Sequence, residues 1–189
     1  MIYDTPQKGE DGMYHVRALT EEKKRCLIQL TGVKVSDVDT NSGEVSFNVT
    51  GEDNQAKLET IHASNIQSAL KNSKEWFGKE LPDKTITNAY MKDDELSVDR
   101  INATRIFDSQ KQPVDFDTLK EDNVCSVFVE FSGLWFAKKA FGPSWNLVQV
   151  KIHEEEKPPP PEPEPEPEPE HPVEAYPEEY MFEDETVSK

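Results

Sequence analysis

The stretch from Pro158 to Glu170 consists of prolines and glutamates, strictly alternating over most of its length, and it limits what the rest of the chain can fold into. Such a segment favours extended polyproline II geometry and has nothing apolar to bury, so it cannot contribute to a core. At about 3.1 Å per residue, it would form a stiff rod of roughly 40 Å. We therefore expect a flexible arm at 1–15, one folded domain at 16–153 and a disordered acidic tail at 154–189.

The negative charge of the chain is concentrated in this tail. The whole chain has 21 Lys and Arg against 38 Asp and Glu, a net charge of −17. The tail holds 14 of the acidic residues and only Lys157 and Lys189, which leaves 19 basic and 24 acidic residues, net −5, for residues 1–153. A body without a basic excess is atypical of proteins that bind polyanions, so any such binding must depend on a local cationic patch combined with ring stacking.

The N-terminal sequence and the two cysteines indicate the cellular compartment that we expect for the chain. The N-terminus lacks a positively charged region leading into an apolar stretch, and the thiols of Cys26 and Cys125 lie far apart in the sequence. No apolar run approaches the roughly 20 residues that a membrane helix needs. We predict an intracellular protein with reduced thiols and no membrane segment.

Alternating apolar and polar residues predict that the body is mainly β. A bulge at Gly32 would bring the apolar residues on both sides of it onto one core face. One helix is predicted over 64–77, capped by Ser64 and ended by Gly78. This order of elements fits a small oligonucleotide/oligosaccharide-binding (OB) barrel, with a β-sandwich as the alternative. The predicted strands are 26–38, 45–49, 96–107, 124–136 and 145–152.

The last two predicted strands form a hairpin whose tip carries rings and lysines. Exposed bases of single-stranded nucleic acid stack on aromatic rings while cations contact the phosphates, and the hairpin supplies both groups. Trp145 is predicted to point outward. Trp135 has two alternatives: an unbroken strand places it in the core, and a bulge at Gly133 turns it outward. The candidate stacking residues are Phe128, Trp135, Phe136, Phe141 and Trp145, and the candidate phosphate partners are Lys138, Lys139 and Lys151.

The end of the tail combines rings with carboxylates. Tyr176, Tyr180 and Phe182 lie among glutamates and Asp184, a composition that imitates a nucleic acid strand with rings for bases and carboxylates for phosphates. We expect this segment to occupy the binding groove of the free protein, to be displaced by DNA and then to bind partner proteins. The alternative is a tail that only increases solubility.

The sequence from Phe131 to Val150, followed by an acidic tail, resembles the phage-type OB-fold single-stranded-DNA-binding proteins of large algal and amoebal DNA viruses, which are similar to those of short-tailed bacteriophages. The resemblance implies coating of single strands in viral DNA replication and recombination, in the host nucleus or a cytoplasmic virus factory. It also implies homodimerisation and tail contacts with polymerase and helicase-primase. DNA contacts are implied at Trp135, Phe136, Lys138, Lys139 and Trp145. The phage proteins end on an aromatic residue, whereas here seven residues follow Phe182.

The sequence does not favour an enzyme. The four histidines are scattered without zinc-ligand spacing, and no glycine-rich phosphate loop is present. We therefore expect no catalysis, no cofactor and no metal. Two non-enzymatic alternatives remain: a structural or virion-associated interaction protein with the Pro-Glu segment as a spacer, favoured by the negative body, and an RNA-binding protein, because only the 2′-OH distinguishes RNA from DNA at a site.

Overall fold

The computed structural model describes residues 1–92 and 95–154, which contain nine strands, three α-helices and one 3₁₀ turn. The predicted tail beyond Glu154, with Tyr176, Tyr180 and Phe182, lies outside the described residues. In chain order the elements are β1 (Ile2–Tyr3), β2 (Gln7–Lys8), β3 (Tyr14–Leu19), β4 (Cys26–Val38), β5 (Glu44–Asn48), α1 (Glu52–Lys71), α2 (Ser73–Phe77), α3 (Asp83–Ala89), β6 (Leu96–Phe107), β7 (Pro113–Val114), the 3₁₀ turn (Phe116–Thr118), β8 (Val124–Phe136) and β9 (Phe141–Ile152).

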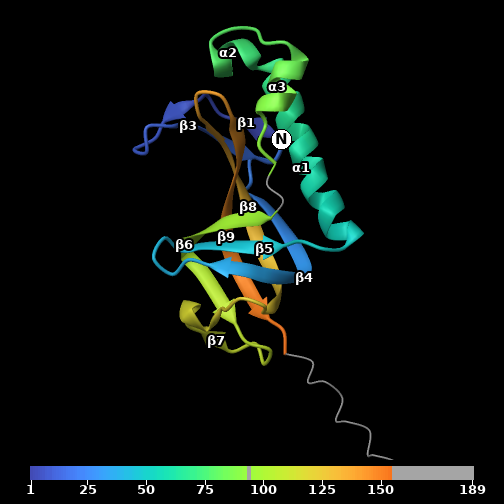
Figure 1. The fold of residues 1–189 in the computed structure, drawn as a ribbon, viewed down its shortest axis with the longest axis vertical. Helices are drawn as coiled ribbons and strands as arrows, with labels where there is room; N and C mark the ends of the chain where they lie inside the picture. The colour runs from blue at the N-terminus through green and yellow to red at the C-terminus, as the bar shows by residue number, and fades with distance from the viewer. Residues whose placement is uncertain (93–94, 155–189) are drawn as a thin grey trace, which may run out of the picture. The chain divides into compact units, whose positions relative to one another are not determined.

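Five of the strands close into a barrel. β4 pairs with β5, β5 with β6, β6 with β9, β9 with β8, and β8 returns to β4. The β6–β9 pair is parallel and the other four are antiparallel. Counted within the barrel, the ring order 1-2-3-5-4-1 is that of an OB barrel, so the mainly β, OB-like prediction is confirmed. In Figure 1, β8 and β9 extend as a long pair from the barrel towards α2 and α3.

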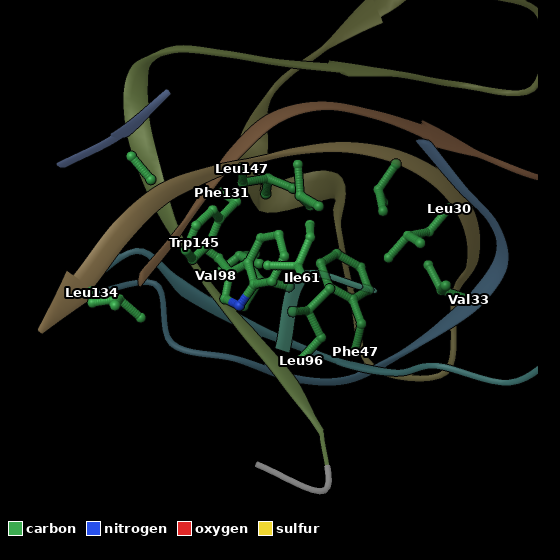
Figure 2. Packing of buried hydrophobic residues seen from close by; sticks show 14 of the residues in the cluster. Leu30, Val33, Phe47, Ile61, Leu96, Val98, Phe131, Leu134, Trp145 and Leu147 are labelled. Carbon is green, nitrogen blue, oxygen red and sulfur yellow. The ribbon is translucent and has the colours of Figure 1, made fainter. Parts of the chain in front are cut away.

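The barrel interior is filled by the apolar faces of these strands (Figure 2). Leu30 and Val33 of β4, Phe47 of β5 and Phe131 of β8 are completely or almost completely buried. The predicted bulge is present, since the register of β4 shifts between Thr31 and Val33, and Gly32 between them has φ 70°. A positive φ is inexpensive for glycine, so the bulge can place the residues before and after it on the same core face.

The helical region is longer than the sequence pattern predicted. α1 begins at Glu52 rather than at Ser64, and only the predicted end at Gly78, in the left-handed conformation, is confirmed. The first turns of α1 hold few apolar residues because their seat on the barrel is polar. The Asn54 side chain accepts a hydrogen bond from the Thr31 N–H and donates one to the Thr31 carbonyl, at 3.1 and 2.8 Å.

The N-terminal segment that was predicted as a loose arm holds two strands paired with β3. Its anchor is a buried polar network. The Tyr3 hydroxyl donates to Asn65 Oδ1 at 2.6 Å, and Asn65 Nδ2 donates to the Tyr90 hydroxyl, which also bonds His62 Nδ1. The Tyr3 ring meets Trp76 edge-on at 5.4 Å. These partners lie more than 60 residues away, so no local pattern predicts the anchor.

Candidate nucleic-acid interface

The β8–β9 hairpin has the predicted lysine-bearing tip. Lys138 and Lys139 are exposed in the four-residue turn between Phe136 and Phe141. The turn is closed by a hydrogen bond from the Ala137 N–H to the Ala140 carbonyl. Both lysines are therefore open to solvent, and their role as phosphate partners stays a prediction.

The aromatic residues next to the tip point inward. Phe141 has no exposed surface and stacks on Phe136, with ring centroids 5.4 Å apart and planes 6° from parallel. Trp145 is 4% exposed, and its ring centroid lies 5.2 Å from that of Phe131 inside the barrel (Figure 2). The prediction that Trp145 points outward is therefore wrong. A buried ring cannot stack on a base without opening the core, so Phe136, Phe141 and Trp145 are not part of the interface built here.

The error at Trp145 has a definite cause. Phe128 pairs with Gln149 and Val129 with Leu147, so Val148 is an extra residue, a β-bulge in β9. A bulge reverses the alternation of faces along a strand. Counting back from Val150 without it places Trp145 outside, whereas the actual strand buries Val150, Leu147 and Trp145 together.

Trp135 follows the bulged alternative. The register of β8 shifts between Phe131 and Gly133, and Gly133 has φ 151°. Beyond this bulge Leu134 and Phe136 are buried, and Trp135 is turned to the other face, where it is half-buried. Its indole covers Gly142, where an added β-carbon would lie 2.8 Å from Trp135 Cζ2, so this glycine makes room for the ring.

Phe128 is the predicted stacking residue that the structure exposes, with 40% of its surface open. It is paired with Gln29 of β4 on one side and Gln149 of β9 on the other, and Gln149 is paired with Arg105 of β6. Directly paired residues point to the same face of a sheet, and all four are exposed. At about 4.8 Å between strands the row is roughly 14 Å long.

A pocket of about 240 Å³ surrounds this ring. Phe107, Lys111 and Lys151 line it together with Phe128 and the two glutamines, and no carboxylate does so among the described residues. We call Gln29, Arg105, Phe107, Lys111, Phe128, Gln149 and Lys151 the sheet-face patch. Phe128 and Lys151 were predicted from the sequence, but the other five residues were missed, because cross-strand pairing brings them together. The only signal for them in the sequence was that they occupy outward-facing positions of several predicted strands.

The distribution of charged side chains around the patch favours an anionic ligand there. The nearest acid on β8, Glu130, contacts Arg25 Nη1 at 3.5 Å and accepts a hydrogen bond from Asn146 Nδ2 at 3.2 Å. The β5–β6 surface, which ligands use in many OB barrels, pairs Glu44 with Asp99 instead and offers serines beside them. The charged side chains that line the pocket on the β4–β8–β9 side are therefore cationic, whereas an acidic pair lies on the β5–β6 surface.

A second hollow lies beside the hairpin tip. It has a volume of about 670 Å³ and is lined by Tyr14, Trp76, Phe77, Leu81 and Phe136, with Lys8, Lys79 and Lys138 at its polar parts. We call it the tip groove. Three of its rings pack against one another, since the ring centroids of Trp76 and Phe77 each lie 5.6 Å from that of Phe136 in edge-on geometry. Tyr14 is 51% exposed.

The thiols and acids show no constellation typical of an enzyme site within the described residues. Burial raises the pKa of the Cys125 thiol to about 12, and burial also raises the pKa of Cys26. No group of three or more His, Cys, Asp or Glu in residues 1–92 and 95–154 could hold a metal ion. In the same residues, no helix combines the length and the hydropathy required to cross a membrane.

The fold and the patch define a class of protein, a closed β-barrel of OB order with an exposed aromatic and cationic sheet face. The chain belongs to a family of unknown function, DUF5871, whose model matches residues 31–164. This match begins in β4, includes the rest of the barrel and extends into the Pro-Glu segment. A search of curated proteins found no match.

Solved structures with a similar arrangement include the single-stranded DNA-binding protein from bacteriophage Enc34, at 12% identity and a TM-score of 0.48, covering 85% of this chain and 94% of that chain. A C-terminal truncation of the same phage protein matches at 12% identity and 0.48, covering 81% and 96%. Its complex with single-stranded DNA matches at 12% identity and 0.46, covering 82% and 98%.

Proposed function

We propose that this protein binds single-stranded DNA on the sheet-face patch. The observation that carries the proposal is Phe128, an exposed ring in the middle of a four-strand row, with cations and amides around it and no carboxylate lining its pocket among the described residues. On a chain of net charge −17, a surface of this composition calls for a specific explanation. A strand of unpaired bases and phosphates matches its chemistry.

Binding would combine three kinds of contact. A base stacks on Phe128, which contributes roughly 1–3 kcal/mol for a sequence-tolerant contact. The amides of Gln29 and Gln149 offer both donors and acceptors to base edges on either side of the ring. Lys111 and Lys151 flank the ring and can contact the backbone phosphates. Arg105 ends the row and adds positive charge there, although its Nη1 already donates to the carbonyls of Asn102 and Thr104.

The exposed lysines of the tip extend this path, and the acidic tail regulates it. Lys138 and Lys139 bind phosphates of strands long enough to reach them from Phe128. The carboxylates of the tail compete with DNA for such cations and, when displaced, recruit replication partners such as polymerase and helicase-primase. The resemblance of residues 131–150 to the proteins of large DNA viruses supports a role in viral DNA replication and recombination, as a homodimer. That assignment stands on the resemblance alone.

Titration of the full chain with fluorescently labelled oligo-dT tests the proposal. Phe128→Ala should weaken binding by about 5- to 150-fold, which corresponds to the loss of one stacked base. Met91→Ala is the matched control: Met91 is an apolar residue of similar exposure, 46%, outside the patch and the groove, and its removal should leave affinity unchanged. Lys151→Gln should reduce the salt slope of binding by about 0.7. Equal affinities of Phe128→Ala and the wild-type chain would refute the proposed surface.

The same titration separates the alternatives. Competition between DNA and RNA oligomers of one sequence reports whether the 2′-OH matters. The negative charge of residues 1–153 favours a structural or virion-associated interaction protein as the alternative function. Absence of any binding at low salt, where electrostatic attraction is strongest, would favour that alternative.

A further inference from the structure

The tip groove combines aromatic rings with exposed lysines. Its rings lie on the floor and sides of a hollow of about 670 Å³, and Lys8, Lys79 and Lys138 are exposed around them. These three lysines take part in none of the ion pairs formed among the described residues. The one lining carboxylate, Asp11, is already bonded to His15 Nε2 at 2.9 Å. A ligand with both rings and negative charges is complementary to such a groove.

The chain contains one segment of that chemistry, residues 175–185. It holds Tyr176, Tyr180 and Phe182, five carboxylates and no basic residue. Its rings match an apolar floor, and its carboxylates match the three lysines of the groove. Tyrosine and phenylalanine bury large areas at a low cost in side-chain entropy, which makes them effective anchors for a short peptide.

The length of the Pro-Glu segment favours the tip groove over the sheet-face patch as the docking site of residues 175–185. The tail leaves the barrel after Ile152, only three residues beyond Gln149 of the sheet-face patch, or roughly 10 Å away. The tip groove lies at the other end of β9, beside Phe136, which pairs with Phe141; eleven residues at about 3.3 Å place it roughly 36 Å from Ile152. A rod of about 40 Å spans the second distance and overshoots the first. To reach the tip groove, the chain has to reverse its direction within residues 154–157, which precede the Pro-Glu segment in the sequence.

We propose that residues 175–185 dock in the tip groove of the same molecule, with the Pro-Glu rod as the spacer that measures the distance. The docking itself does not depend on DNA binding; only its effect on DNA binding rests on the proposed function. The docked tail covers Lys138 and leaves the sheet-face patch open, so the tail competes only with strands that extend from Phe128 to the tip, about 33 Å along β8. Shorter strands bind regardless of the tail.

Nuclear magnetic resonance of the full chain without nucleic acid tests the docking. The triple variant Tyr176→Ala, Tyr180→Ala, Phe182→Ala removes the rings and keeps all carboxylates, and Val173→Ala with Val187→Ala is its control outside the segment. The triple variant should shift the indole signal of Trp76 and the amide signal of Tyr14, while the signals of Gln149 and Lys151 stay in place. The control should shift none of them.

A synthetic peptide of residues 173–186 completes the test. Added to the triple variant, it should return the Trp76 signal to its position in the wild-type chain. Lys79→Glu should weaken this peptide binding severalfold, because it reverses a charge at the groove, and Lys74→Glu, also exposed but outside the groove, should not. Docking within one molecule predicts that the Trp76 position in the wild-type chain is unchanged on tenfold dilution.

Three outcomes would overturn the inference. These are no shift at Trp76 in the triple variant, shifts at Gln149 and Lys151 in its place, and a Trp76 position that changes with protein concentration. None of them involves DNA. Failure of the docking is therefore distinguishable from failure of DNA binding, which the Phe128→Ala titration decides separately.

Discussion

Gly133→Ala tests the bulge that determines the direction of Trp135. The glycine has φ 151°, a region that side chains with a β-carbon rarely adopt, and an added β-carbon would lie 1.9 Å from the Val16 carbonyl oxygen. The clash is between the backbones of β8 and β3, so no side chain can turn away to relieve it. β3 would have to move by more than about 1 Å to bring the Val16 carbonyl oxygen to an ordinary contact distance of about 3.5 Å from the new β-carbon. Val16 pairs with Leu134 and Arg17 with Gly133, so this movement breaks the last two pairs of the β3–β8 ladder.

The expected cost follows from these two effects. Backbone strain of this kind costs about 1–3 kcal/mol, and two ladder hydrogen bonds contribute about 1 kcal/mol each. A loss of about 3–5 kcal/mol in the free energy of unfolding is a large part of the roughly 5–15 kcal/mol available to a domain. Urea unfolding followed by far-UV circular dichroism measures this free energy.

Gly78→Ala is the matched control for this prediction. Gly78 also has a positive φ, 72°, at the end of α2, but a β-carbon there would meet no atom within 4 Å. Its substitution should cost only the left-handed strain, about 1–2 kcal/mol. If Gly133→Ala destabilises the protein no more than Gly78→Ala, the close approach of β3 to the bulge is refuted, and with it the reason for the orientation of Trp135.

Further predictions concern the charges and the thiols. Replacing Lys138 and Lys139 together by alanine should lower the salt slope of oligo-dT binding by about 1.4, whereas Lys74→Ala should not; an unchanged slope would exclude phosphate contacts at the tip. A chain ending at His153 should bind long strands more tightly than the full chain at 0.01 M salt, where screening acts over about 30 Å, and the difference should shrink at 0.15 M; equal affinities at low salt would contradict competition by the tail. Because burial raises the pKa of Cys125 to about 12, only Cys26 should react with a thiol reagent at pH 8 before unfolding, and two rapidly reacting thiols would show an open barrel.

The strands of the barrel were predictable because their signal is local. β4, β6 and β8 begin and end at the predicted residues, and the bulge at Gly32 followed from two apolar pairs of opposite parity. Such alternation depends only on neighbours along the chain and on the inside and outside of the sheet. The number and order of the strands favoured an OB barrel, but a β-sandwich stayed open as the alternative because periodicity does not show how a sheet closes.

Prediction from the sequence failed where an unmarked bulge, or a contact between residues far apart in the chain, determines the local structure. The bulge at Val148 has no glycine or proline to mark it, so Trp145 was assigned to the wrong face. The first half of α1 is seated by Asn54 on the backbone of Thr31, and Tyr3 is held by Asn65; neither polar contact produces a hydrophobic pattern. The sheet-face patch combines residues of four strands and the loop before β7, so only pairing reveals it.

The two proposed sites together give a physical account of how a strongly acidic chain could bind a polyanion. The body has a net charge of only −5; its β5–β6 surface carries an acidic pair, and cations line the pocket of Phe128, the surface proposed for the strand. The tail contributes −12 of the total charge and would block that side if it were attached by a short flexible linker. In the docking proposed above, the Pro-Glu segment acts as a stiff spacer of about 40 Å that separates the rings and carboxylates from the end of β9. On this proposal, one protein can carry both a binding face for DNA and a competing polyanion without permanent self-inhibition.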